Sequence, residues 1–122
     1  PELDMATLSE VLCLNFPAKY PVKNKRSKFG LAFSTDTGRR RLQDQNLIIG
    51  IEPYDSLPYD EFRKVIDAVL PYIQSGMDEN WPQDRKSIAD IWPRFRYLLS
   101  DQFFEYVYNE WKMYLKIGER WQ

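Results

Sequence analysis

Two short stretches of the chain pair an acidic residue with a lysine two positions later, a spacing that some metal-dependent nucleases use. They are Asp84-Arg85-Lys86 and Glu110-Trp111-Lys112. In those enzymes the pair lies on a strand, where the carboxylate holds Mg²⁺ and the lysine assists the attacking water. Here the first stretch is expected in a loop and the second on a helix. We therefore interpret both as solvated charges, and a metal-dependent enzyme using carboxylates ranks third among our hypotheses.

The chain of 122 residues contains no histidine and a single cysteine, Cys13. Histidine is the usual general base near neutral pH and the commonest metal ligand, so His-based triads and zinc sites are excluded. One cysteine cannot build a zinc ribbon, an iron–sulfur site or an internal disulfide. Glycine-rich phosphate-binding motifs are also missing. We expect no cofactor, no metal and no catalytic residue, and we expect Cys13 to be a small buried thiol.

Positive charge is concentrated between positions 19 and 41. This segment contains eight basic residues and one acidic residue, Asp36, so its net charge is +7. The whole chain has a net charge of −1. Such asymmetry can guide an anionic partner, either a nucleic acid or an acidic protein surface, although solvated loops would look the same. A pI near 5.5 weighs against nucleic acid. The residues that we expect to contact the partner are Lys23, Lys25, Arg26, Lys28, Arg39, Arg40 and Arg41.

Hydrophobic spacing predicts helices at both ends of the chain. The first covers about 5–14 and is capped by Asp4. The clearest begins near Pro58 and ends at Gly76, with apolar residues three and four positions apart. A capping box at Ser87–Asp90 predicts a shorter helix that Pro93 interrupts. The predicted core includes Ile66, Val69, Phe104, Val107 and Trp111.

The final predicted helix, from about 101 to 117, has an apolar arc wider than a one-sided surface helix requires. Either the helix is central in the domain, or its extra edge contacts a partner such as a second copy of the chain. Glu110 falls inside the arc, where burial would require a partner such as Arg94 or Arg96. The edge proposed for a homodimer interface consists of Phe103, Tyr106, Met113 and Ile117.

Between these helices the pattern changes to one that predicts strands. Phe29, Leu31 and Phe33 alternate with small residues, and a β-branched run covers 47–51. A turn signature at 36–38 separates them, and residues 39–43 could add a third strand. The expected fold class is α+β, with a small antiparallel sheet of two or three strands packed against three to four helices. In this arrangement the C-terminal half of the chain is all helical.

Length and composition indicate one domain that covers residues 1–122. An alternative reading makes residues 1–4 a cloning remnant ahead of a native start at Met5. The sequence is 43% hydrophobic and 16% aromatic, which suits a packed core. No apolar stretch approaches the roughly 18 residues that span a bilayer, and no signal peptide is evident. We expect a cytoplasmic protein without membrane contact.

These features favour a non-enzymatic intracellular binding or regulatory protein that acts stoichiometrically on a protein partner, as inhibitors, immunity proteins and adaptors do. The alternative is a nucleic-acid-binding protein that uses residues 19–41.

Overall fold

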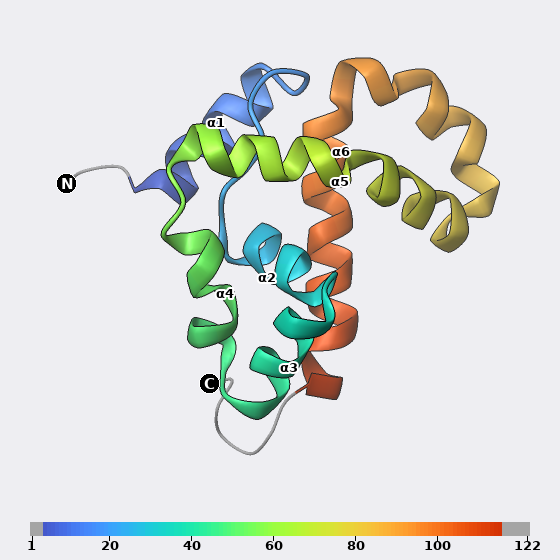
Figure 1. The fold of residues 1–122 in the computed structure, drawn as a ribbon. Helices are drawn as coiled ribbons and strands as arrows, with labels where there is room; N and C mark the ends of the chain where they lie inside the picture. Colours follow the sequence, from blue (N-terminus) through green and yellow to red (C-terminus); the bar gives the residue numbers. More distant parts are fainter. Residues whose placement is uncertain (1–3, 116–122) are drawn as a thin grey trace.

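The computed structural model describes residues 4–115, with side chains as far as residue 112, and every regular element in this range is helical. Figure 1 shows the arrangement of these elements. In order they are α1 (Met5–Asn15), α2 (Lys25–Phe33), α3 (Asp36–Asp44), α4 (Leu47–Asp55), α5 (Tyr59–Asn80), the 3₁₀ turn η1 (Pro82–Asp84) and α6 (Arg85–Leu115).

The predicted antiparallel sheet does not occur in residues 4–115, so the α+β fold class is wrong. The first expected strand is α2, which begins at a capping box in which Asn24 and Ser27 each accept a hydrogen bond from the other's backbone amide. Its alternation of large and small residues is misleading because Gly30 and Ala32 are buried along with Phe29. A helix that is buried on most sides has no polar face. Its apolar residues therefore do not recur at the three- and four-residue spacing by which a helix is predicted.

Caps also explain why the other expected strand segments are helical. The side-chain oxygen of Asn46 accepts a hydrogen bond from the backbone amide of Ile49 at 2.8 Å and caps the start of α4. The hydroxyl of Thr35 accepts one from the amide of Gly38 at 2.9 Å, so the turn signature at 36–38 is the first turn of α3. These side chains satisfy amides that the first turn leaves unpaired, and this local gain outweighs the weak strand preference of β-branched residues.

The helices predicted in the second half of the chain are confirmed, with different ends. α5 continues past Pro71 and Gly76 to Asn80. The two later helices are one element, α6, which contains a break at Phe95 (φ −129°, ψ 18°). Pro93 lies two residues earlier and lacks the amide that a regular helix requires. The predicted end of this helix at residue 117 lies outside the described residues.

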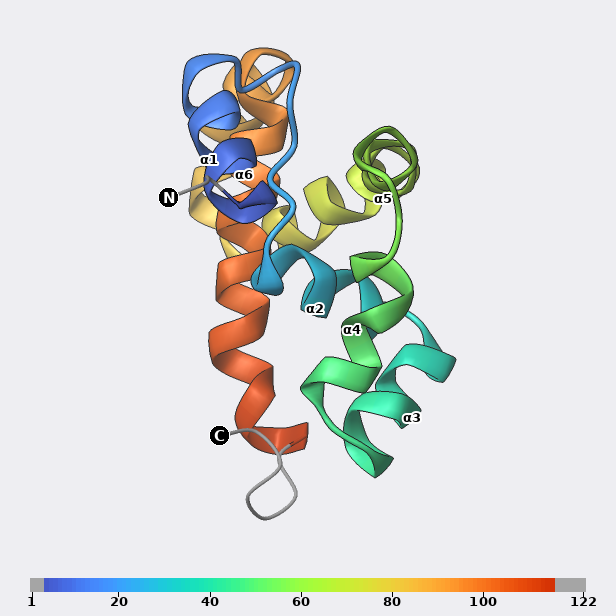
Figure 2. The same ribbon diagram turned by 90° about the vertical axis from the view of Figure 1, so that its left-hand side faces the viewer.

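Helix α2 is at the centre of the fold, between α6 and the α3–α4 pair (Figures 1 and 2). α5 packs against α6, and α1 makes a smaller contact with α6. Close approach of α2 to α6 depends on Gly30, where a Cβ atom would lie 2.1 Å from Cδ1 of Phe104. One core cluster includes Leu31, Phe62, Ile66, Ile73, Tyr97 and Phe104, and a second consists of Phe29, Ala32, Leu42, Leu47 and Val107.

The predicted core is confirmed at three of its positions and wrong at one. Ile66, Phe104 and Val107 are buried, whereas Val69 is half-buried. Trp111 is 44% exposed. Its ring stacks on Phe33 near the end of α2. The exposed part of Trp111 contributes to the site described next.

Candidate functional site

An open groove of about 450 Å³ lies between α2, α5 and α6. We call it the aromatic groove. Its floor includes Leu31 and Ile73, which also belong to the main core cluster. Tyr72 projects from α5 at its edge and is 77% exposed. The aromatic residues that line the groove are Phe33, Tyr72, Phe103, Phe104, Tyr106 and Trp111.

Contacts between rings and with polar atoms fix the walls of the groove. The rings of Phe33 and Trp111 stack at 5.6 Å between centroids, which ties the end of α2 to α6. Tyr106 lies 4.8 Å from Trp81, and its hydroxyl donates to Oδ1 of Asn80 at 3.1 Å. Aromatic pairs of this kind add to the energy of burial alone. Contacts within the chain therefore fix the shape of the groove.

A glycine on α5 provides room for one of the aromatic walls. A Cβ atom at Gly76 would lie 2.6 Å from Cζ of Phe103, closer than real side chains approach. Phe103 can therefore lie directly against the α5 backbone, and it also contacts Trp81 edge-on at 6.2 Å. This packing keeps Phe103 at the side of the groove instead of across it.

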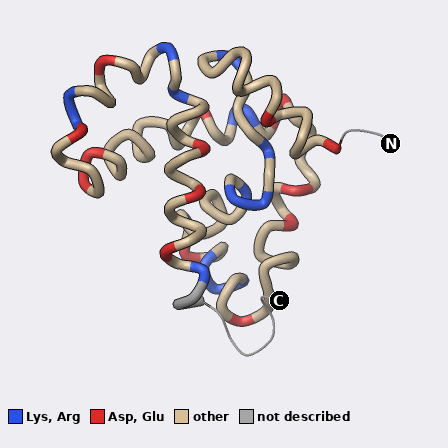
Figure 3. The backbone as a smooth tube through the Cα atoms, turned by 180° about the vertical axis from the view of Figure 1, so that it is seen from behind, with Lys and Arg blue, Asp and Glu red and all other residues tan. Residues whose placement is uncertain are grey.

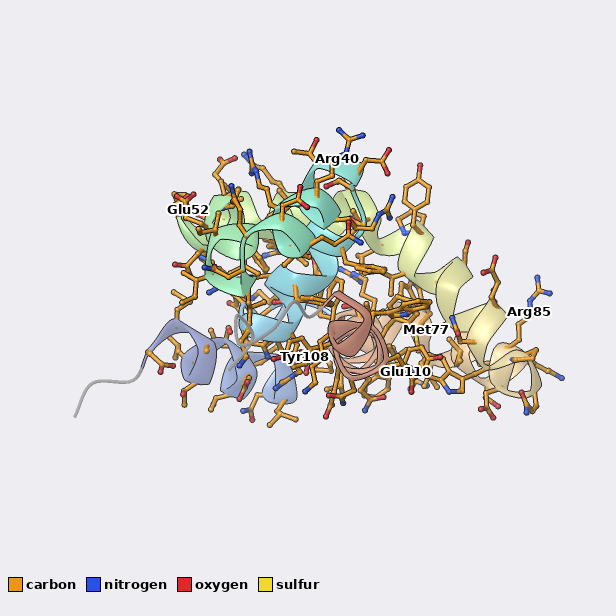
Figure 4. All side chains as sticks on the ribbon, turned by 90° about the horizontal axis from the view of Figure 1, so that it is seen from below. Arg40, Glu52, Met77, Arg85, Tyr108 and Glu110 are labelled. Atoms are coloured by element: carbon orange, nitrogen blue, oxygen red, sulfur yellow. The ribbon has the colours of Figure 1, made fainter. Side chains whose placement is uncertain are left out.

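The lining of the groove carries negative charge. Among the described residues that line it, Glu79 is the only charged one. Glu110 is exposed and lies three residues after Val107 and four after Tyr106, which places it on the same side of α6. Figure 4 shows it on the side of α6 opposite Tyr108, toward Met77 of α5. The expected burial of Glu110 against an arginine is therefore wrong.

The basic side chain of Arg39 lies close to the groove, but it already has partners on α2 and α3. The guanidinium of Arg39 lies 5.7 Å from the centroid of the Phe33 ring. It forms an ion pair with Asp36 and donates to the backbone oxygen of Phe33 at 3.0 Å. These contacts satisfy much of its hydrogen-bonding capacity, so Arg39 offsets the two rim carboxylates only weakly.

The acidic-x-Lys stretches do not form a site. Asp84 is exposed in η1, and Lys86 is exposed in the first turn of α6. On a helix, residues two apart point roughly 200° away from each other. Glu110 therefore cannot share a ligand with Lys112, whose ammonium lies 4.5 Å from the centroid of the Tyr108 ring. Within residues 4–115 no cluster of three or more Cys, Asp or Glu residues is suited to hold a metal ion.

Cys13 is buried, as expected. Burial, together with the nearby negative charge of Asp101, raises the pKa of its thiol to about 12. The thiol is therefore protonated at neutral pH and is a poor nucleophile.

The predicted basic partner-binding residues do not form one surface. Lys23 is buried, and its ammonium donates to the backbone oxygens of Asp55 at 3.3 Å and Leu57 at 2.5 Å. Burial lowers the pKa of Lys23. Lys28 forms an ion pair with the carboxylate of Asp55 at 2.5 Å.

The remaining basic residues are divided between two helices. Arg26 lies between Glu10 and Asp101, at 3.5 and 3.8 Å, and burial raises the pKa of Asp101 even though Arg26 opposes that shift. Lys25 lies 5.6 Å from the centroid of the Tyr108 ring. Arg40 and Arg41 are exposed on α3. Figure 3 shows the basic positions of α2 and α3 as separate groups.

Comparison of the chain with protein-family models, curated proteins and solved structures finds no match in any of the three. No helix within residues 4–115 combines the length and the apolar character that crossing a bilayer requires.

Two of the four residues predicted as a self-association edge belong to the aromatic groove. Phe103 and Tyr106 are half-buried and contact Trp81 within the same chain. The Met113 side chain and Ile117 lie outside the described residues. Self-association stays a prediction. Sequence reasoning missed Phe33 and Tyr72, because Phe33 was expected in a strand and Tyr72 falls outside the core spacing of its helix.

Proposed function

We propose that this protein is a non-enzymatic binding protein that holds an apolar segment of a protein partner in the aromatic groove. The observation that carries the proposal is an open, apolar concavity with large aromatic side chains exposed at its edge. Tyr72 and Trp111 are both partly solvent-exposed there. Aromatic residues are enriched at the centres of protein interfaces and account for much of their binding energy. The groove also has the volume of a typical ligand site.

Stoichiometric binding fits the groove better than catalysis does. Within the described part of the chain its lining has one carboxylate, Glu79, and no lysine, cysteine or arginine that could act with it. A hydrolytic or transfer reaction requires several polar groups that converge on one reacting atom. An inhibitor, immunity or adaptor protein requires only a fixed surface. The single buried thiol suits the reducing conditions of the cytoplasm, where we place the protein.

Nucleic-acid binding through residues 19–41 has less support. Lys23, Lys28 and Arg26 have partners within the chain, so they are not available to neutralise phosphates. Arg40 and Arg41 are exposed, but two charges on one short helix give a small electrostatic footprint. Binding of DNA or RNA that depends on these two arginines is the outcome that would restore this alternative.

The first prediction tests the groove with peptides selected from a random displayed library on the folded protein. Replacing Tyr72 by Ala should weaken the selected peptides by roughly tenfold or more, which corresponds to about 1.4 kcal/mol. Binding is measured by fluorescence anisotropy. Tyr72 is exposed, so the substitution should leave stability almost unchanged.

The matched control is Ile48→Ala on α4, because Ile48 is 75% exposed, much as Tyr72 is, and does not line the groove. This variant should bind as the wild type does. If the selected peptides bind the wild type and the Tyr72 variant equally, the groove is not the binding site and the proposal fails.

A further inference from the structure

We infer that the segment held in the aromatic groove is a basic amphipathic helix, with large apolar side chains inserted into the groove and lysine or arginine beside them. This inference rests on the proposed function and adds the chemistry of the partner. Two features carry it, namely the kind of wall that the groove presents and the sign of the charge at its rim.

The walls favour a helical occupant. All three are the sides of helices, α2, α5 and α6, whose backbone groups are bonded within the helices themselves. Residues 4–115 contain no strand whose edge an extended segment could join. An extended segment would leave backbone N–H and C=O groups against apolar rings without partners, which is costly. A helix satisfies its own backbone and presents side chains at spacings of three, four and seven residues.

The rim favours a basic occupant. Glu79 lines the groove from α5, and Glu110 is exposed on the side of α6 that Figure 4 shows toward Met77 of α5, so both carboxylates are near the groove. The nearby Arg39 is already paired with Asp36. An acidic segment would bring like charges together at the edge of an apolar site, where they are poorly screened. Complementary charges at a rim mainly set specificity and the rate of association.

The experiment compares three synthetic peptides of about 18 residues, long enough for five helical turns. The first has leucine and phenylalanine at positions i, i+3, i+4 and i+7, with lysine, alanine and glutamine elsewhere. The second replaces each lysine by glutamate. The third has the composition of the first with its apolar positions scrambled. Affinities are measured by anisotropy at two salt concentrations, and helix formation by circular dichroism.

The basic peptide should bind about tenfold more tightly than the acidic one, a difference near 1.4 kcal/mol. It should become more helical when bound, and the preference should shrink as salt screens the rim charges. The scrambled peptide should bind at least tenfold more weakly than the basic peptide. The Tyr72→Ala substitution should weaken the basic peptide, which places it in the groove.

Charge reversal at the rim provides the sharper test. The double variant Glu79→Lys, Glu110→Lys should prefer the acidic peptide. The matched control is Glu52→Lys with Glu61→Lys, which makes the same change in net charge at exposed positions on α4 and α5 that do not line the groove. Glu52 lies far from Glu110 (Figure 4). The control variant should keep the preference of the wild type, and circular dichroism verifies that both variants are folded.

The outcomes separate the two proposals. If the acidic peptide binds the wild type as well as the basic one does, or if both rim variants behave alike, the partner is not selected by charge. The inference then fails, whereas the proposed function survives as long as Tyr72→Ala still weakens binding. If the bound basic peptide gains no helix, the helical occupant is wrong. If neither peptide binds better than the scrambled one, the inference fails, and the proposed function is decided by whether Tyr72→Ala weakens the peptides selected from the library.

Discussion

Single residues show why counting charges along the chain was a poor guide to its surface. Lys23 and Arg40 belong to the same basic segment, yet Lys23 is buried against backbone oxygens and Arg40 is exposed on α3. An ammonium group on a flexible stem can reach carbonyls that a chain turn leaves unpaired, and here it bonds to the end of α4. Lys23 therefore holds the molecule together instead of contacting an anionic partner.

A second prediction follows for Lys23. Replacing it by Met keeps the length of the side chain but leaves the oxygens of Asp55 and Leu57 without this donor. Hydrogen bonds to charged groups contribute about 1.5–3 kcal/mol, so the free energy of unfolding should fall by about that amount. Arg40→Met, the control, should change it by less than about 0.5 kcal/mol. Urea denaturation measures both, and equal midpoints for the two variants would show that the Lys23 bonds contribute nothing.

The sequence predicts the environment of a single residue more readily than it predicts which distant residues meet in one site. The burial of Cys13 is confirmed, but the apolar spacing of its helix points to the wrong face: Ser9 is buried beside it, whereas Leu8 and Val11 are exposed. The aromatic groove could not be predicted. Phe33, Tyr72 and Trp111 come from three helices, and only their packing brings them to one groove.

At the scale of elements, the sequence was informative where a helix has one polar face and misleading where it has none. α5 has one apolar and one polar face, and its predicted start near Pro58 agrees with the observed start at Tyr59. α2 is enclosed by α6, α3 and α4, so its apolar residues follow no helical period. Its capping residues, Asn24 and Ser27, were the better signal because they act locally and do not depend on the rest of the fold.

The third prediction concerns the contact between α2 and α6. Gly→Ala within a helix usually stabilises a protein by up to about 1 kcal/mol. At Gly30 the sign should reverse, because the new methyl group would overlap the Phe104 ring. We expect Gly30→Ala to lower the free energy of unfolding by about 1–3 kcal/mol. Thermal and urea denaturation test this.

The overlap itself has a direct control. Phe104→Leu in the Gly30→Ala background should restore part of the lost stability, since it removes the ring that the methyl group strikes. If Gly30→Ala is as stable as the wild type, the two helices are further apart than described.

At the scale of the whole molecule, the helices are not equally tied together. α6 contacts α1, α2 and α5, whereas α3 and α4 pack mainly on α2 and on each other. Small helical pairs at the margin of a domain can open without global unfolding. The groove depends on α2, α5 and α6, so such an opening would leave most of it intact.

The fourth prediction uses amide hydrogen exchange. Amides in α3 and α4 should exchange with a lower opening free energy than those of α6 around Phe104, because fewer buried contacts hold the pair. Leu42→Ala should increase exchange in α3 and α4 more than in α5. If every helix exchanges at the same free energy in the wild type, the molecule opens only as a whole and the pair is not a separate unit.

The central position of α2 also has a consequence for the newly made chain. α2 emerges from the ribosome well before α6, the helix that covers Phe29 and Leu31 together with α4. A nascent chain that ends within α5 has α2, α3 and α4 but lacks the C-terminal helix against which Gly30 packs. Domains that complete their core late in synthesis expose apolar surface during translation. Chaperone binding to ribosome-bound chains should therefore peak before α6 has emerged and decline once Phe104 and Val107 reach α2.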